Sequence, residues 1–513
     1  MIVSKKVIAV PLNPDKSHLV SFFPKHKIVT AQSGDYLVVP RTIEYALELK
    51  RLELTTAKLT GGYKYPGRFR PYTHQIDTTE FMVAHPRAFC LNDMGTGKTA
   101  SCIWAAEFLR QAGLVKRVLI VSLISCMKSV WDSELFGICP QRYTAIAYGS
   151  PEYREQVIFN EPDYVIINPD GIRIVEEALK WYSPDLIIID EASAYKHPGT
   201  KKYKALKNIV RDDTRIWMLT ATPAANSPAD VYGLIKLVNP MAIQESMTQF
   251  KNRIMIKISN FKWVPKSNAV ETVMGYMRPA IRYDKKDCLD MPPVTYIFKG
   301  AELSKEQAHA FEQMKNFLRV EGANDVHVTA VNAAVKMTKL LQICLGVVYD
   351  DEKKHRFLDT SPRIELLDEI LEEAGDKCII FVPFKGVISS LEKHLAKKYN
   401  VAVVTGDTSL AKRSEIFRGF QHDSTPQHLI AHPQTTSHGL NLTRSHNTIW
   451  YGPIYNTEFY IQANNRSDRP GQTHPVTITH IFATELERKL YAALRDKQKM
   501  QDLILDLYSE LTR

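Results

Sequence analysis

Two stretches of this chain alternate short apolar runs with segments of helical spacing. The first stretch starts near residue 68 and contains RAFCLND, RVLIVSL, YVIIN, DLIIIDE and RIWMLTATP. The second starts near residue 361 and contains KCIIFVPF, VAVVTG, QHLIAHP, TIWYG and VTITHIF. Runs that are apolar at nearly every position are typical of strands buried on both faces of a parallel sheet. We therefore predict an α/β protein with two parallel-sheet domains.

The remaining segments divide the chain further. The runs KKVIAVPL, LVSFF, HKIVTA and DYLVVP predict short strands, and RTIEYALELKRLEL predicts a helix, before the turn residues of GGYKYPG. Lys- and Met-rich helical patterns precede the second alternating stretch. We therefore predict five parts: a small N-terminal α+β accessory domain at 1–67, an α/β domain at 68–240, a helical insert and linker at 241–360, a second α/β domain at 361–483 and a helical tail at 484–513.

Composition narrows the class of protein. With 44% hydrophobic and 24% charged residues, the 513-residue chain is typical of globular proteins. A net charge of +10 favours a polyanionic partner, although a solvated basic surface explains it equally well. The seven cysteines form no CxxC pair, so neither a zinc site nor a redox motif is indicated. Without a signal peptide or a run of about 18 apolar residues, we expect no membrane contact and a cytoplasmic location.

The run LNDMGTGKTA lies between a predicted strand and a predicted helix, which is the context of a phosphate-binding loop. Gly95 and Gly97 would let the backbone approach an anion closely. Lys98 would reach the β- and γ-phosphates of a nucleotide, and the Thr99 hydroxyl would bind Mg²⁺. The full pattern has another Gly where Asn92 stands, so the loop alone leaves a turn without a nucleotide as an alternative.

An acidic pair ends the strand run DLIIIDE. Asp190 and Glu191 stand where the carboxyl end of a buried strand would place them beside a magnesium–nucleotide complex. Asp190 would hold the metal through water, and Glu191 would orient and deprotonate the attacking water. The alternative is a pair of residues that caps a helix.

Arginines gather in the run YIQANNRSDRPGQ. It places Gln462, Arg466, Arg469 and Gln472 in one short stretch. Arg466 and Arg469 are three residues apart, so on a helix they would share a face. Guanidinium groups stabilise the charge that spreads over a transferring phosphoryl group. A solvated basic helix is the alternative for this stretch.

These three motifs, in this order, resemble the motor core of superfamily-two helicases, and most closely the Swi/Snf-like branch, over about 69–490. RPYTHQ resembles the family's adenine-reading motif, RVLIVSLISCMKSVWDSEL resembles motif Ia, and MLTATPAANSPADVYGLIKLVNP resembles motif III. KCIIFVPF and TTSHGLNL resemble motifs IV and V. The family does not require Gly at the position of Asn92. The compact chain resembles versions of this motor that bacteriophages carry, for which cytoplasmic would mean the host cytoplasm.

The resemblance implies two tandem RecA-like domains, with ATP and Mg²⁺ as cofactors. Two departures stand out: Ser193 replaces a His that is frequent in motif II, and Thr436 and Ser437 replace paired glycines in motif V. The implied catalytic residues are Lys98, Asp190, Glu191, Gln462, Arg466 and Arg469. The implied ATP contacts are Gln75, Gly95, Thr96, Gly97, Lys98, Thr99, Gly439 and Asn441, with Thr99 and Asp190 at the metal.

The resemblance also implies DNA as partner, bound through its backbone without sequence preference. We expect a DNA-dependent ATPase that translocates on duplex or branched DNA and remodels forks, junctions or protein–DNA complexes in replication, recombination or repair. A strand-separating helicase, an ATP-switched scaffold with low turnover and an RNA remodeller are alternatives. We expect a monomeric motor, with replication or recombination proteins as further partners. The implied DNA contacts, each of whose hydroxyls could be an ordinary turn or cap residue, are Ser122, Lys128, Asn168, Thr220, Lys385, Thr405, Thr435 and Thr436.

Overall fold

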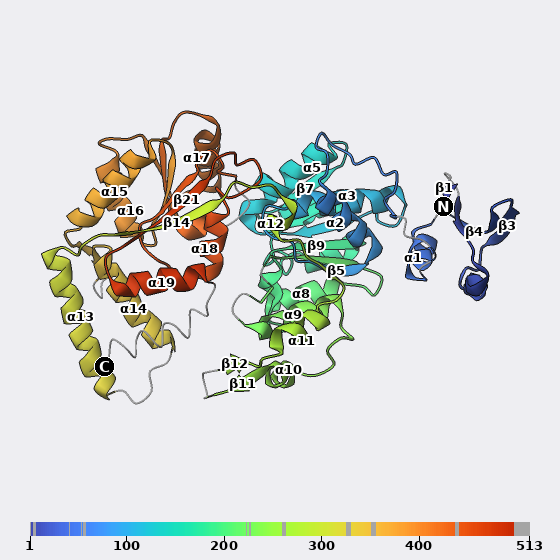
Figure 1. The fold of residues 1–513 in the computed structure, drawn as a ribbon, viewed down its shortest axis with the longest axis horizontal. Helices are drawn as coiled ribbons and strands as arrows, with labels where there is room; N and C mark the ends of the chain where they lie inside the picture. Colours follow the sequence, from blue (N-terminus) through green and yellow to red (C-terminus); the bar gives the residue numbers. More distant parts are fainter. Residues whose placement is uncertain are drawn as a thin grey trace. The chain divides into compact units, whose positions relative to one another are not determined.

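The chain divides into two compact units in a computed structural model (Figure 1). The structure describes residues 2–3, 7–40, 42–52, 54, 58–221, 223–224, 227–258, 263–324, 330–349, 355–436 and 441–496. The first unit contains 1–223, 228–254 and 267–288, and the second contains 224–227, 255–266 and 289–513.

A seven-stranded sheet forms the centre of the first unit. Its strand order is β13-β5-β10-β9-β6-β8-β7, and every neighbouring pair is parallel. The strands are β5 (Arg87–Cys90), β6 (Val118–Val121), β7 (Thr144–Ala147), β8 (Tyr164–Ile167), β9 (Leu186–Asp190), β10 (Arg215–Leu219) and β13 (Ala280–Ile281). The helical elements are α2 (Thr73–Ala84), α3 (Lys98–Gln111), α4 (Ile124–Cys126), the π-helical η2 (Met127–Asp132), α5 (Ser133–Ile138), α6 (Pro151–Phe159), α7 (Glu176–Tyr182), η3 (Ala192–Tyr195), α8 (Lys201–Ile209), η4 (Pro228–Val231) and α9 (Tyr232–Val238).

A six-stranded sheet forms the centre of the second unit. Its order is β14-β21-β20-β17-β19-β18, again parallel throughout. The strands are β14 (Val294–Gly300), β17 (Cys378–Phe381), β18 (Val401–Val404), β19 (His428–Ala431), β20 (Asn447–Trp450) and β21 (Val476–Phe482). The helices are α13 (Lys305–Asn324), α14 (Ala330–Cys344), α15 (Ser361–Ala374), α16 (Lys385–Leu395), α17 (Leu410–His422), η5 (Pro433–Thr435), α18 (Thr457–Asn464) and α19 (Glu485–Arg495). Two parallel sheets covered by helices confirm the predicted fold class.

The segment predicted as a helical insert, 241–360, does not form one separate body. It contains helices, among them α13 and α14, but β13 belongs to the first sheet and β14 to the second. The other elements of this segment are α10 (Met247–Ile254), α11 (Ala269–Tyr276), α12 (Lys285–Cys288), the hairpin of β11 (Met255–Lys257) and β12 (Trp263–Pro265), and the hairpin of β15 (Val347–Tyr349) and β16 (His355–Phe357). The five domain boundaries remain a prediction.

The N-terminal residues form an antiparallel sheet of order β1-β2-β4-β3. The predicted strand at LVSFF is wrong, because these residues lie in and just after the 3₁₀ helix η1 (Pro14–Phe22). Val20 and Phe23 are the buried residues of this stretch, and their separation of three matches the 3₁₀ repeat rather than strand alternation. The strands are β1 (Ile2–Val3), β2 (Val7–Pro11), β3 (Lys27–Ala31) and β4 (Gly34–Pro40).

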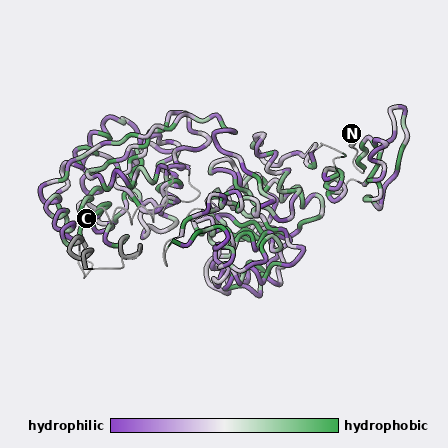
Figure 2. Tube along the Cα trace, turned by 60° about the horizontal axis from the view of Figure 1, so that its bottom comes forward, coloured by the Kyte–Doolittle hydropathy of each residue, from purple (hydrophilic) through white to green (hydrophobic). Residues whose placement is uncertain are grey.

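Helix α1 (Ile43–Arg51) has two apolar faces. Leu49, with Tyr45 beside it, packs into the core of the N-terminal sheet. Ile43 and Leu47, one turn apart, pack into the core around the seven-stranded sheet. The helix therefore attaches the N-terminal sheet to the first α/β domain. In the tube of Figure 2 the hydrophobic stretches gather inside this domain. Among the described helices, none has the length and apolar character needed to cross a membrane.

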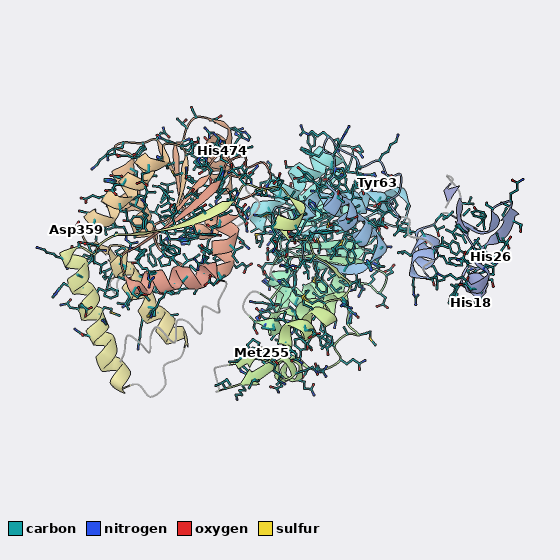
Figure 3. The ribbon with its side chains drawn as sticks, viewed as in Figure 1. His18, His26, Tyr63, Met255, Asp359 and His474 are labelled. Carbon is teal, nitrogen blue, oxygen red and sulfur yellow. The ribbon has the colours of Figure 1, made fainter. Side chains whose placement is uncertain are left out.

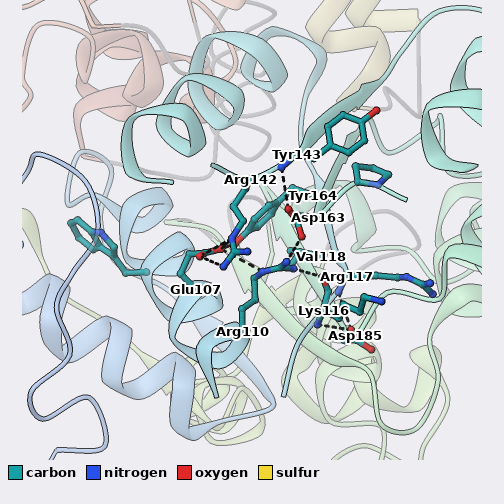
Figure 4. A network of polar contacts seen from close by, with 12 residues as sticks. Glu107, Arg110, Lys116, Arg117, Val118, Arg142, Tyr143, Asp163, Tyr164 and Asp185 are labelled. Atoms are coloured by element: carbon teal, nitrogen blue, oxygen red, sulfur yellow. Dashed lines mark hydrogen bonds and ion pairs between the residues drawn. The ribbon is translucent and has the colours of Figure 1, made fainter. Parts of the chain in front are cut away.

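Helix α3 is held at its middle and its C-terminal end. Tyr63, labelled in Figure 3, donates its hydroxyl to the carbonyl of Trp104, and the Trp104 indole donates to the carbonyl of Pro66. Figure 4 shows the polar network at the other end. There the buried Glu107 carboxylate accepts hydrogen bonds from Arg142 (2.8 Å) and from Tyr164 (2.7 Å). These contacts fix the helix whose N-terminus follows the glycine loop.

Candidate functional site

The glycine loop connects β5 to α3 as predicted. Gly95 has φ of 83° and Gly97 has φ of 79°, in the left-handed region that glycine adopts readily. A Cβ atom at Gly97 would also collide with the side-chain amide of Gln75. The first turn of α3 follows directly, and its backbone N–H groups have no partners within the helix. Such a loop and helix start can hold a phosphate group.

The first turn of α2 is fastened to this loop. The Gln75 amide donates to the carbonyl of Thr96 (3.2 Å) and accepts from the backbone of Tyr72 (3.0 Å). His74 Nε2 lies 2.9 Å from the same Thr96 carbonyl. Gln75, the predicted adenine contact, therefore also shapes the loop. The role of His74 was missed by sequence reasoning, although it is part of RPYTHQ.

Lys98 lies across its own loop. Its Nζ donates to the carbonyls of Asn92 (2.8 Å) and Asp93 (3.0 Å). Its charge also acts on Asp190, where it favours the ionised carboxylate. The loop and the acidic end of β9 are therefore within electrostatic reach of each other.

Asn92 occupies the position where the full phosphate-loop pattern has Gly. Its side chain is 1% exposed. Its Nδ2 donates to the Thr78 hydroxyl (2.9 Å), and its Oδ1 accepts from the backbone N–H of Tyr283 (3.0 Å). It thus links the start of the loop to α2 and to the segment after β13. Spacing along the sequence gives no sign of a partner 191 residues away.

Asp190 ends β9 beside the end of β6. Because Val121 pairs with Ile189, Ser122 follows its strand next to Asp190. Ser122 Oγ and Trp131 Nε1 both donate to Asp190 Oδ2, at 3.3 and 2.8 Å. Burial raises the pKa of the Asp190 carboxyl above its usual range, and the Trp131 hydrogen bond and the Lys98 charge oppose this.

The residues around Asp190 fit a magnesium ion that is coordinated partly by the protein and partly by the phosphates of a nucleotide. Thr99 is half-buried in the first turn of α3, and Glu191 has φ of 57° directly after β9. Over the described residues, no group of three or more His, Cys, Asp or Glu side chains could hold a metal. A carboxylate and a hydroxyl suit Mg²⁺, which takes one or two protein oxygens together with phosphate oxygens and water.

The second unit holds the predicted arginines, but not on one helix face. Helix α18 ends at Asn464, before Arg466 and Arg469, so the prediction of a shared helical face is wrong. The Arg466 carbonyl accepts from the backbone of Leu442, and Pro470, four residues further on, has no N–H with which a helix could bond that carbonyl. Arg466 is buried and its Nε donates to the Gln462 carbonyl (2.8 Å), whereas Arg469 is half-exposed.

The remaining predicted residues of this motif region have different surroundings. The buried Gln462 donates to Glu458 (3.2 Å). The Gln472 amide donates to the carbonyls of Thr443, Ser445 and Ser467, so it holds two loops together. Asn441 is exposed and accepts from the backbone of Thr443 (3.3 Å). Gly439 lies outside the described residues.

In the first unit, one predicted DNA contact is exposed. Lys128 lies at the surface on η2. Ser122 is fully buried against Asp190, so the structure gives its hydroxyl a partner inside the protein. Asn168 is 8% exposed and its Oδ1 accepts from Arg154 (3.0 Å), while Thr220 is 2% exposed.

In the second unit, Lys385 is exposed and pairs with Asp407 (2.7 Å). Thr405 is half-buried, and its backbone N–H donates to the Thr408 hydroxyl. The hydroxyls of Thr435 and Thr436 are turned inward and donate to the carbonyls of His432 (2.7 Å) and Pro433 (3.1 Å).

Both α/β domains match known families. Residues 74–346 match the SNF2-related domain, and residues 362–471 match the helicase conserved C-terminal domain. These matches confirm the predicted resemblance to Swi/Snf-like superfamily-two helicases.

Individual relatives are distant. Protein p41 of Acyrthosiphon pisum secondary endosymbiont phage 1 is 26% identical, over 85% of this chain and 98% of p41. The CHD3-type chromatin-remodeling factor CHR7 of Arabidopsis thaliana is 22% identical, over 89% of this chain but 39% of that protein. The transcription regulatory protein SNF2 of Saccharomyces cerevisiae is 25% identical, over 80% and 26% of the two chains. This chain therefore spans less than half the length of these two eukaryotic proteins.

One solved structure is similar over most of this chain. The SWI2/SNF2 ATPase core of Sulfolobus solfataricus in complex with double-stranded DNA is 22% identical, over 87% of this chain and 95% of that chain, with a TM-score of 0.43.

Proposed function

This chain belongs to the SNF2-related family of ATP-dependent, helicase-like enzymes, and on that basis we propose that it is a DNA translocase. It hydrolyses ATP when bound to duplex or branched DNA and uses the cycle to remodel forks, junctions or protein–DNA complexes. The observation that carries the proposal is the half-buried Asp190 carboxylate at the end of β9, within electrostatic reach of Lys98 in a glycine loop that opens a helix.

Each residue of the first unit has a role in this proposal. The loop and the N-terminus of α3 bind the phosphates, and the Lys98 ammonium moves from its loop carbonyls to the β- and γ-phosphates. Thr99 and Asp190 hold Mg²⁺, Asp190 through water. When bound, the ion neutralises charge that develops on the phosphates. Glu191 orients and deprotonates the attacking water.

The second unit contributes arginine. The Nε of Arg466 already donates within the protein, and its side chain is buried. Arg469 is half-exposed, which favours it as the group that reaches the transferring phosphoryl. An arginine from a second unit makes hydrolysis depend on closure of the two units, and repeated closure would move the motor along DNA.

The expected partner is the DNA backbone. Lys128 and Lys385 are the exposed cations among the proposed contacts. The net charge of +10 adds a sequence-independent attraction that salt weakens. Roles in replication, recombination or repair, and partner proteins from those processes, belong to the same proposal, as does a monomeric motor.

The test is steady-state ATP hydrolysis without nucleic acid and with single-stranded DNA, duplex DNA, a four-way junction or RNA. Strong stimulation by duplex or junction DNA supports the translocase. Stimulation by single strands alone favours a strand-separating helicase, and stimulation by RNA alone favours RNA remodelling. Negligible turnover with every nucleic acid favours an ATP-switched scaffold. The control is Lys98→Ala, in which we expect turnover to be abolished, so any remaining rate in that variant measures contamination.

A further inference from the structure

Trp131 contributes an indole N–H to the acidic end of β9. Its side chain is fully buried, and its Nε1 lies 2.8 Å from Asp190 Oδ2. A hydrogen bond to an ionised acceptor is stronger than one between neutral groups. The family match assigns no such task to this tryptophan, and its spacing of 59 residues from Asp190 gives no sign of it.

The local backbone explains how a tryptophan reaches this carboxylate. Trp131 lies on η2, a six-residue π-helical segment between two short α-helical segments. A π-helical turn contains more residues than an α-helical turn, so it shifts the direction of the side chains that follow. Met127 and Trp131, four residues apart, are both buried, while Lys128 on the same segment is exposed.

Two donors then fix one carboxylate. Ser122 comes from the end of β6, and Trp131 comes from the helix that follows that strand. Both donate to the same oxygen, Oδ2, so rotation of the carboxylate about its Cβ–Cγ bond would stretch both hydrogen bonds. The carboxylate therefore has one preferred orientation before any ligand arrives.

We propose that Trp131 is a positioning residue for the divalent cation: its N–H holds Asp190 in the orientation that receives Mg²⁺ with the nucleotide. The proposal rests on the proposed ATPase function. Residues that orient metal ligands typically change metal affinity by about 10- to 100-fold when they are replaced. Loss of the indole N–H leaves Ser122 as the one side-chain donor described at Asp190 Oδ2.

The chain supplies a matched control. Trp217 is also fully buried and packs in the same core, and its Nε1 donates to the carbonyl of His85 (3.1 Å) rather than to Asp190. Trp131→Phe and Trp217→Phe each remove one buried indole and one hydrogen bond. A general loss of packing would affect both variants, whereas a role in holding Asp190 belongs to Trp131.

The measurement is binding of a fluorescently labelled, non-hydrolysable ATP analogue to the full chain, followed by anisotropy as Mg²⁺ is raised. We expect Trp131→Phe to need about 10-fold more Mg²⁺ for half-maximal binding than the wild type. Trp217→Phe should keep the wild-type midpoint. Equal midpoints for the two variants would overturn the inference while leaving the proposed function intact.

The Mg²⁺ titration also covers two other cases, a wild-type chain that binds no nucleotide and a Trp131→Phe variant that does not fold. A wild-type chain that binds no nucleotide at any Mg²⁺ concentration overturns the proposed function, and the inference with it. If Trp131→Phe does not fold, 3-benzothienylalanine at position 131 keeps the ring shape and replaces the N–H by sulfur. The same Mg²⁺ shift in that protein supports the inference, and an unchanged midpoint overturns it.

Discussion

Asn92→Gly restores the full phosphate-loop pattern, and we expect it to weaken the protein. The backbone at Asn92 does not adopt a positive φ, so glycine offers no conformational gain there. The side chain is 1% exposed and makes two hydrogen bonds, to the Thr78 hydroxyl and from the Tyr283 N–H. The substitution removes both.

The two bonds differ in what their loss costs. The Thr78 hydroxyl still donates to the carbonyl of His74 (2.7 Å), so it loses only a role as acceptor. The Tyr283 N–H loses its acceptor, which costs about 1–3 kcal/mol. Added flexibility of the unfolded chain costs about 0.4–1 kcal/mol more. A total near 2.5 kcal/mol lowers the melting temperature of a domain of about 200 residues by about 5–10 °C.

The assay combines thermal unfolding with ATP binding. Because the start of the loop loses its attachment to α2, we also expect ATP to bind at least about fivefold more weakly, equivalent to about 1 kcal/mol. The control is Asn160→Gly, an exposed position after α6 with φ of −72°, which should change stability by less than about 1 kcal/mol. A melting temperature and an ATP affinity for Asn92→Gly that match this control would refute the reasoning.

Three other substitutions test separate parts of the protein. Glu191→Gln should bind ATP and DNA but hydrolyse slowly, measured by single-turnover rates beside binding; rapid turnover would remove the assignment of Glu191 as base. Arg469→Ala should leave ATP binding nearly intact and lower kcat by about 10³-fold, and an unchanged kcat would make this arginine structural. Burial, with a smaller effect of Arg495, lowers the pKa of His480 to about 3, and His480 Nε2 lies 2.9 Å from the Tyr460 hydroxyl. Between about pH 6.5 and 3, His480 therefore binds a proton in the unfolded state but not in the folded state. The stabilisation is complete above pH 6.5 and is lost as the pH is lowered toward 3. The free energy of unfolding is measured with urea at several pH values across this range. In His480→Gln its change with pH should be smaller by at most about 1.4 kcal/mol per pH unit, and an unchanged pH dependence would contradict this.

The interior strands could be predicted because they are apolar on both faces. All four residues of β8 are buried, and such runs stand out in the sequence. The three strands of the large sheets that were missed, β7, β13 and β14, lie at sheet edges. In β14 no residue is fully buried, and β7 alternates between half-buried and buried positions. These three edge strands therefore lack the continuous burial of the interior strands, whereas the edge strand β18 was predicted because its four residues are all apolar.

The contacts between side chains could not be predicted in the same way. The glycines, Lys98 and Asp190 were found because the phosphate loop and the acidic strand end have local patterns. The donors to Asp190, and the partner of Asn92 at Tyr283, come from distant parts of the chain. The helical spacing of the arginines failed for a local reason, since Pro470 and Gly471 follow Arg469 directly and oppose a helix there.

The family motifs therefore contain two kinds of residue, which the structure distinguishes by their burial. Ser122, Thr436 and Gln472 are buried, and their polar groups already have partners inside the protein. Lys128 and Arg469 are exposed or half-exposed, so they can reach a ligand without breaking the protein's interior. Replacing a residue of the first kind leaves a buried polar group without its partner and lowers stability along with activity. Replacing an exposed or half-exposed residue leaves its surroundings open to water, so we expect a smaller loss of stability, and Arg469 gives a cleaner test of the motor than Gln472.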